Sequence, residues 1–251
     1  MDELLTQLKE KISDVADIEL LINLNRRILE KKEHIRRYIR IRKLHSDILD
    51  SMINYIDDGN YNIDAQFISI GKFINRETKN SRFVYNSNDA GDNSILTELF
   101  VYKNHPKIKS ITDIYLEKRH FRNETKVRLL RSMKNSVVGL FKIIAVDSDN
   151  GYITCEDVFT HKKYKVIDIA LSSTTKIDKY MTIYLYNRII TFDNISYFSG
   201  IHCLMTSKNK ELMEFIKKHK YKSCSDFGRC LILYDISKRE KNLKIHYNDN
   251  C

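Results

Sequence analysis

The sequence contains few prolines, glycines and tryptophans: its 251 residues include one proline, seven glycines and no tryptophan. A single proline argues against long extended linkers. So few glycines leave no glycine-rich phosphate loop, and neither Gly-x-Ser-x-Gly nor His-Glu-x-x-His occurs. The sequence therefore lacks the common signatures of nucleotide-binding proteins, serine hydrolases and zinc proteases, and we expect a protein that is not an enzyme.

Cysteine is also scarce, and its pattern excludes a disulfide framework. The five cysteines are an odd number and form no Cys-x-x-Cys pair, so we expect reduced thiols in a cytoplasmic protein. Cys224 and Cys230 are badly spaced for a structural zinc site, so we expect neither a metal nor another cofactor. No apolar run approaches the roughly 20 residues of a membrane helix, and no leader peptide is visible, so we expect no membrane association.

Positive charge is what the chain has in excess. Lysine and arginine total 43 against 33 acidic residues, which gives a net charge of +10. Such a balance favours anionic partners: nucleic acid, anionic lipid or an acidic protein surface. Frequent Ile, Asn, Lys and Tyr are typical of AT-rich genomes, so part of the lysine excess has a compositional origin. Charge alone does not choose among these partners.

Residues 136–205 show a regular succession of apolar runs and turn signals, and this pattern predicts a small β-barrel. Asp149-Asn150-Gly151 is a hairpin signal, and Asp193-Asn194 is a weaker one. Gly139 inside an apolar strand indicates a bend or a close backbone approach, and Phe141 should be buried. Five strands joined mainly by tight turns favour a small SH3-like or OB-like barrel. The predicted strands are 137–146, 151–158, 163–169, 181–190 and 195–201.

The N-terminal part predicts one long helix from Ile18 to Ile56. Apolar residues recur there at multiples of seven positions, with Arg42 on the same stripe. Such a period indicates a helix that packs lengthwise on another helix: the short helix predicted at 2–13, a second subunit or another protein. The residues expected to contact a protein partner or to form a homo-oligomer are Leu21, Ile28, Ile35, Leu49 and Ile56.

The same helix carries a dense set of basic side chains. Two interpretations stay open: a solvated helix face, or a surface that contacts phosphates or an acidic partner. The residues that would form this surface are Arg26, Arg27, Lys31, Lys32, Arg36, Arg37, Arg40 and Lys43.

Aromatic residues on the predicted strands offer a second possible surface, because small barrels bind nucleic acid by stacking bases on exposed rings. About half of these residues must fill the barrel. Tyr184 and Tyr186 alternate with Ile183 and Leu185, which makes the tyrosine pair the candidate exposed set. The complete set is Tyr152, Tyr164, Tyr184, Tyr186, Tyr197 and Phe198.

Together these patterns predict an α+β protein: an N-terminal long helical hairpin or coiled coil, a helical segment with a five-stranded antiparallel barrel, and C-terminal helices near 208–219 and 223–239. The expected divisions are a helical arm at 1–58, a connecting segment at 59–93 and a barrel domain at 94–251. We expect the barrel domain to fold without the arm.

Residues 94–201 resemble a segment of bacterial proteins that often end in a SEC-C metal-binding motif. The matching segments are Ser136-Val137-Val138-Gly139-Leu140-Phe141-Lys142-Ile143, Asp157-Val158-Phe159-Thr160-His161, Tyr164-Lys165-Val166, Lys179-Tyr180-Met181, Arg188-Ile189-Ile190 and Ser199-Gly200. His161 replaces the turn glycine of that pattern, and Asp157 is expected to hold the turn by accepting backbone N–H bonds. The cysteine-rich SEC-C tail is absent, so the resemblance implies no metal site, and it supplies no catalytic residue.

The leading interpretation is a non-enzymatic cytoplasmic protein that assembles with a partner through the long basic helix and the barrel. The alternative is a nucleic-acid-binding protein that uses the basic face between Arg26 and Lys43. Salt-dependent binding to nucleic acid separates the two.

Overall fold

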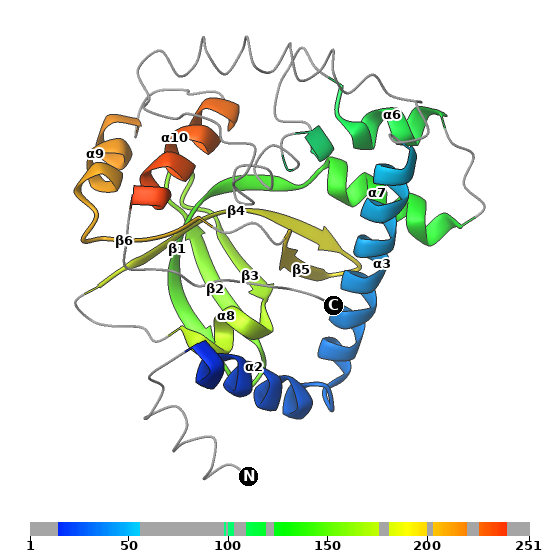
Figure 1. The fold of residues 1–251 in the computed structure, drawn as a ribbon, viewed down its shortest axis with the longest axis horizontal. Helices are drawn as coiled ribbons and strands as arrows, with labels where there is room; N and C mark the ends of the chain where they lie inside the picture. Colours follow the sequence, from blue (N-terminus) through cyan, green and yellow to red (C-terminus); the bar gives the residue numbers. More distant parts are fainter. Residues whose placement is uncertain are drawn as a thin grey trace.

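The structure is a computed structural model that describes residues 15–55, 98, 100–102, 109–118, 123–175, 181–199, 203–219 and 226–239. The predicted helix at 2–13, residue Ile56 and the connecting segment at 59–93 lie outside this set. Figure 1 shows the arrangement of the elements around a central sheet. The helices are α2 (Val15–Leu29), α3 (Glu33–Tyr55), α6 (Ile111–Lys118), α7 (Glu124–Lys134), α8 (Ile169–Thr174), α9 (Lys210–His219) and α10 (Asp226–Arg239). The strands are β1 (Val137–Asp147), β2 (Tyr152–Asp157), β3 (Lys163–Ile167), β4 (Ile183–Phe192), β5 (Ile195–Phe198) and β6 (Cys203–Thr206).

Five of the strands close into a barrel, which confirms the α+β class and the small barrel. The order is β1-β2-β3-β5-β4, and an additional pairing of β4 with β1 closes the ring. The β3–β5 pair is parallel, and α8 lies in the connection between β3 and β4. This is the arrangement of an OB-type barrel. β6 was not predicted as a separate strand, and it extends the sheet beyond β4.

The tight turns form where the sequence indicated them, because their residues adopt backbone angles that few side chains tolerate. Gly151 has φ 71°, and Asp193 and Asn194 have φ 47° and 63°. At the β2–β3 turn, Asp157 accepts the backbone N–H groups of Phe159 and Thr160 at 2.9 and 2.7 Å, which confirms its predicted role. His161, which replaces the turn glycine, has φ 59°.

Gly139 marks the predicted close approach. A Cβ atom at this position would lie 2.6 Å from the Asp157 carboxylate, which is far inside van der Waals contact. A side chain at 139 would therefore push the β2–β3 turn away from β1. Phe141 is fully buried in the barrel, with its ring against Tyr164 and Phe198, as the sequence predicted.

The single helix predicted from Ile18 to Ile56 is wrong, because the chain bends at residues 30–32. The bend is built from short-range bonds: the backbone N–H of Lys32 donates to Leu29 at 2.9 Å. It lets two apolar side chains reach one place, since the Cδ1 atoms of Leu29 and Ile35 lie 3.3 and 3.0 Å from where a Cβ on Gly151 would be. A straight helix could not bring both onto the end of the β1–β2 hairpin.

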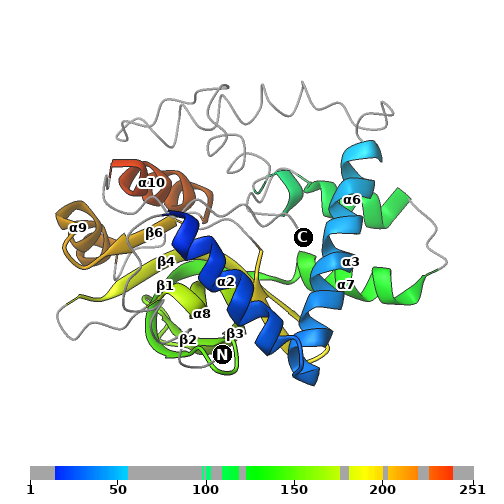
Figure 2. The ribbon, with the colours of Figure 1, turned by 60° about the horizontal axis from the view of Figure 1, so that its bottom comes forward.

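The apolar residues of the predicted stripe are therefore buried against other elements of the same chain, and they do not form a lengthwise helix pair. Leu21 and Ile35 are 1% and 0% exposed, whereas Ile28 and Leu49 are half-buried. α2 packs on α8, and α3 packs on α6, α7 and β5. In Figure 2, α2 lies across the barrel next to α8 while α3 runs along its side. The buried face of α3 is Ile35, Ile41, His45, Ile48 and Met52.

A buried polar network ties α3 to the outside of the barrel. Arg188 on β4 forms an ion pair with Glu98, and its guanidinium lies 4.3 Å from the Tyr102 ring centroid. The Tyr102 hydroxyl shares a 2.8 Å hydrogen bond with Nε2 of His45. Burial, aided by the charge of Arg42, lowers the pKa of His45 to about 3. Burial raises the pKa of Glu98, and the neighbouring Arg188 opposes that rise. These contacts join the described part of the arm to the barrel.

Candidate nucleic-acid interface

Part of the outward side of β1, β2 and β3 carries exposed and half-buried side chains. The register pairs Lys142 with Glu156 and Ala145 with Thr154 across β1 and β2. It then pairs Glu156 with Lys163 and Thr154 with Lys165 across β2 and β3. Facing partners in a sheet project to the same side, so these side chains form one surface. We call this surface the barrel face; it comprises Lys142, Ala145, Tyr152, Thr154, Glu156, Lys163 and Lys165.

An aromatic stack lies at one end of the barrel face, beside the β1–β2 turn. The ring of Tyr152 is half-buried and stacks on the ring of His34, with centroids 5.0 Å apart and planes 8° from parallel. The Lys165 ammonium lies 4.0 Å from the Tyr152 centroid. Burial raises the pKa of Tyr152, and the charge of Asp147 adds to the rise, so the phenol stays neutral. The stack gives the face a rigid aromatic element.

Lysines lie along the barrel face: Lys165 is beside the stack, and Lys142 and Lys163 flank Glu156, four residues along β2 from Tyr152. Lys142, Lys163 and Lys165 are exposed. Within the described part of the chain, neither Lys142 nor Lys163 forms an ion pair or donates a side-chain hydrogen bond. The one carboxylate between them, Glu156, is engaged by His161 at 3.1 Å. Uncommitted ammonium groups on the same side of a sheet as an aromatic ring are what an anionic, base-bearing polymer requires.

The start of α3 holds the edge of this surface in place. Lys32 Nζ donates to the carbonyl of Asp149 at 2.6 Å and to Oδ1 of Asn150 at 2.7 Å. His34 Nε2 contacts the carbonyl of Asn150 at 2.9 Å. The hairpin turn and the helix N-terminus are therefore fixed to each other, and the His34 ring is fixed against Tyr152.

Several of the basic residues predicted on the long helix form hydrogen bonds or ion pairs within the protein. Arg37 donates to the carbonyl of Asp193 at 3.0 Å, so it binds α3 to the β4–β5 turn. Arg42, on the predicted stripe, donates to the carbonyl of Phe198 at 3.0 Å. Arg26 pairs with Glu30 at 3.0 Å. These side chains are engaged with the protein itself.

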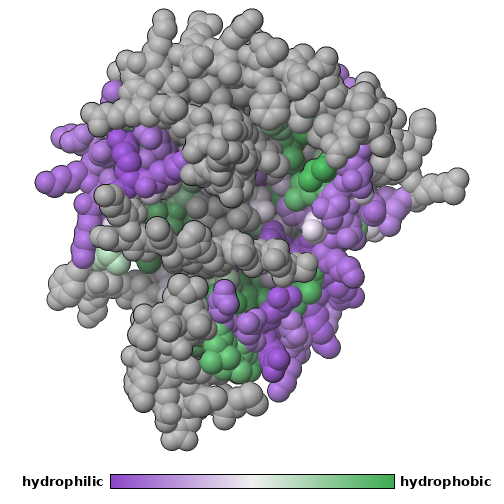
Figure 3. Space-filling model, viewed as in Figure 1, coloured by the Kyte–Doolittle hydropathy of each residue, from purple (hydrophilic) through white to green (hydrophobic). Residues whose placement is uncertain are grey.

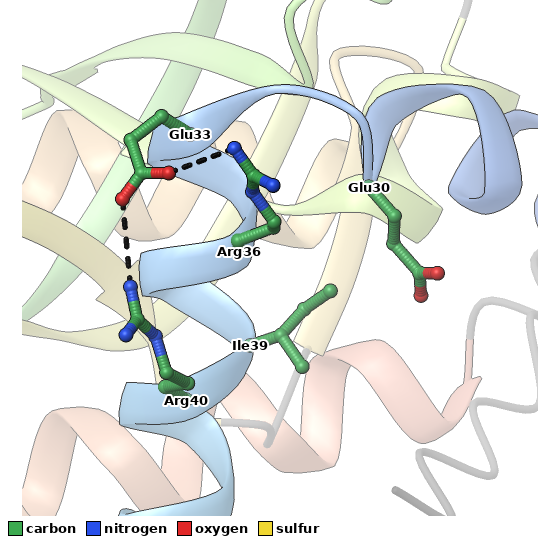
Figure 4. A pocket seen from close by; sticks show the side chains of 5 residues that line it. All are labelled: Glu30, Glu33, Arg36, Ile39 and Arg40. Atoms are coloured by element: carbon green, nitrogen blue, oxygen red, sulfur yellow. Dashed lines mark hydrogen bonds and ion pairs between the residues drawn. The ribbon is translucent and has the colours of Figure 1, made fainter.

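Further cations of this set surround an open hollow at the bend between α2 and α3 (Figure 4). Glu33 lies between Arg36 and Arg40, at 2.9 and 3.5 Å from their guanidinium groups. All three side chains are more than half exposed, so these pairs are weak. Arg27, Lys31 and Lys43 are exposed as well. Figure 3 shows a mainly hydrophilic surface along α3 and over α9.

Tyr184 and Tyr186 are not on the surface, which corrects the predicted exposed pair. They are 9% and 5% exposed. β4 is covered on both sides, so alternation along this strand does not expose either set of residues: Leu185 points into the barrel, and α7 and α10 pack against β4. The aromatic residue on the outward face is Tyr152 instead, and it is half-buried. Its position directly after the hairpin glycine, on a strand that alternates between buried and half-buried residues, was the signal that could have found it.

The thiols show no sign of reactivity in the described residues. Burial raises the pKa of both Cys155 and Cys203 to about 12. Cys155 packs inside the barrel as a small apolar side chain. No group of three His, Cys, Asp or Glu side chains within the described residues is placed to hold a metal ion. In the same part of the chain, no helix is long and apolar enough to cross a membrane.

These features define a mixed α+β protein built on an OB-type barrel with a basic, aromatic-bearing face. The chain belongs to the family of unknown function DUF7986, whose model matches residues 32–246. No curated protein and no solved structure matches the chain. The resemblance to SEC-C-associated proteins stays a prediction.

Proposed function

We propose that this protein binds nucleic acid through the barrel face, without catalysing a reaction. The observation that carries the proposal is the combination of the Tyr152–His34 stack with the uncommitted lysines Lys142 and Lys163 on one exposed sheet surface. Lysines supply phosphate contacts, and aromatic rings supply contacts to bases. The OB-type arrangement agrees with this use, since such barrels bind oligonucleotides on the face of their second and third strands.

The proposal moves the interface from the basic helix to the barrel. Arg37 and Arg42 already bind the barrel turns and β5, and Glu33 neutralises part of the charge of Arg36 and Arg40. Assembly through the apolar stripe has less support, because Leu21 and Ile35 are buried within the chain.

The test is the salt dependence of binding to a fluorescein-labelled oligonucleotide, measured by anisotropy. Lys142→Glu with Lys163→Glu should weaken binding and lower the slope of log affinity against log salt by roughly 1.4, because each phosphate contact on a single strand contributes about 0.7. Lys217→Glu with Lys218→Glu on α9 makes the same change in net charge at another exposed place and should leave the slope unchanged.

A third variant, Arg36→Glu with Arg40→Glu, separates the barrel face from the basic helix. If this variant removes binding while the Lys142 and Lys163 pair does not, the helix face is the interface and the proposal is wrong. Wild-type protein that binds no oligonucleotide at low salt also overturns it.

A further inference from the structure

The contact between Lys165 and Tyr152 occupies a position that a nucleic-acid base can take. The register places Ile167 opposite Tyr152 and Lys165 opposite Thr154, so Lys165 approaches the ring from the centre of the sheet. There its ammonium lies 4.0 Å from the ring centroid. Besides this contact, no ion pair or hydrogen bond of the Lys165 side chain occurs among the described residues. Lys165 is an exposed, flexible side chain, so it can move away from the ring.

The positions directly opposite Tyr152 are Asp147 on β1 and Ile167 on β3, and the next outward positions along the strands carry small side chains. Ala145 and Thr154 face each other across β1 and β2, next to Tyr152 along the strand, and both side chains are small. His34 contacts the Tyr152 ring in a parallel stack and is itself held by the carbonyl of Asn150. The ring is therefore supported by a fixed neighbour, with small side chains next to it along the strand and the Asp147 carboxylate opposite it.

We propose that the barrel face binds single-stranded nucleic acid, with one base stacked on Tyr152 in the place that Lys165 holds in the free protein. This inference rests on the proposed function and adds the form of the ligand and the role of each residue. Stacking of a base on an aromatic ring is a stronger contact than an exposed cation–π contact. When a base takes its place on the ring, the long Lys165 side chain can move to a neighbouring phosphate and form an ion pair there.

A duplex cannot make this contact, because its bases are already stacked and paired and do not offer a free face. The inference therefore predicts discrimination between strands of equal phosphate content. It also assigns His34 as a positioning residue that orients the Tyr152 ring and does not itself have to contact the ligand.

The test compares ring variants with the wild-type protein, using a single-stranded oligonucleotide that contains 2-aminopurine. Tyr152→Leu should weaken binding about tenfold and remove the quenching of 2-aminopurine fluorescence on binding. Tyr152→Phe keeps the ring and should retain both affinity and quenching. Circular dichroism melting of each variant checks that the barrel remains folded. A duplex of the same length should bind at least about tenfold more weakly than the single strand.

The outcomes separate this inference from the proposed function. Binding that depends on Lys142 and Lys163 but is unchanged by Tyr152→Leu overturns the stacking inference alone. Equal affinity for duplex and single strand does the same. If no oligonucleotide binds at low salt, both proposals are wrong. Loss of binding in Tyr152→Leu together with full binding and quenching in Tyr152→Phe supports the inference.

Discussion

The barrel and the two helices beside it, α2 and α3, are stabilised in different ways. The barrel strands satisfy one another's backbone hydrogen bonds, because each of the five strands of the barrel pairs with two others and β4 closes the ring onto β1. The helices bury their apolar residues only against other elements: Leu29 and Ile35 against the β1–β2 hairpin, and Met52 in the same cluster as α6 and α7 residues. The strand pairing of the barrel is therefore specified by neighbouring strands, whereas the helices depend on surfaces that distant segments provide.

The same contrast applies to the candidate interface. Its lysines come from β1 and β3 and follow from the register of neighbouring strands. The ring that supports Tyr152 comes from α3, which reaches the sheet from far away in the sequence. The barrel thus supplies the charges, and the helix fixes the orientation of the aromatic element.

The largest expected effect comes from removing the helices. Contrary to the expectation from the sequence that the barrel domain folds without the arm, deletion of residues 1–55 should abolish cooperative unfolding. It exposes the apolar residues of β5, α6 and α7 that α3 contacts, and it removes the His45 partner of the Tyr102 hydroxyl. Differential scanning calorimetry should show no sharp transition. A truncated chain that melts as sharply as the full one would show that the barrel domain folds without its arm.

A pair of substitutions compares the two regions at single positions. Phe141→Ala in the barrel should lower the free energy of unfolding by about 3–5 kcal/mol, and Ile35→Ala on α3 by about 2–5 kcal/mol. Both side chains are 0% exposed, so each substitution leaves a cavity. Urea unfolding measures both. If Ile35→Ala lowers the free energy of unfolding by less than about 1 kcal/mol, α3 contacts the barrel only peripherally and is not part of its core.

His45 predicts a dependence on pH that originates in the helix. Its pKa in the folded protein is about 3, whereas an exposed histidine has a pKa of 6.5. Below pH 6.5 the unfolded chain takes up a proton that the folded chain refuses, so stability falls as the pH is lowered towards 3, by about 1.4 kcal/mol per pH unit.

His45→Gln keeps a polar side chain beside Tyr102 and removes this titration. The difference in unfolding free energy between wild type and His45→Gln should therefore change with pH between 6.5 and about 4 and stay constant above pH 7. A constant difference across the whole range would mean that the histidine is not buried in its neutral form.

The smallest effect is expected on the exposed side of the same helix. Glu33→Gln removes the ion pairs with Arg36 and Arg40, yet stability should change by less than about 0.5 kcal/mol, because all three side chains are well exposed. The measurement is the same urea unfolding at two salt concentrations. A loss above about 1 kcal/mol would show that the bend between α2 and α3 depends on these charges.

Much of the barrel was predictable because its signals are local. The hairpin at Gly151, the turn at Asp193-Asn194, the close approach at Gly139 and the bonds of Asp157 all follow from residues a few positions apart or from one strand pair. Backbone angles and period-two alternation act over this short range. The sequence by itself therefore determined the strands, their turns and the buried position of Phe141.

Only the tertiary structure decided where the helix bends and which aromatic residue lies on the outward face. The seven-residue period does mark apolar side chains that become buried. The surfaces that cover them lie far away in the sequence, so the period alone suggests a separate partner. Leu29, Ile35 and Gly151 meet because folding brings the hairpin between the helices. Likewise, His34 and Asn150 are 116 positions apart, and no local pattern predicts their contact. Burial of Tyr184 and Tyr186 depends on α7 and α10, whose packing is fixed by complementary shape rather than by sequence period.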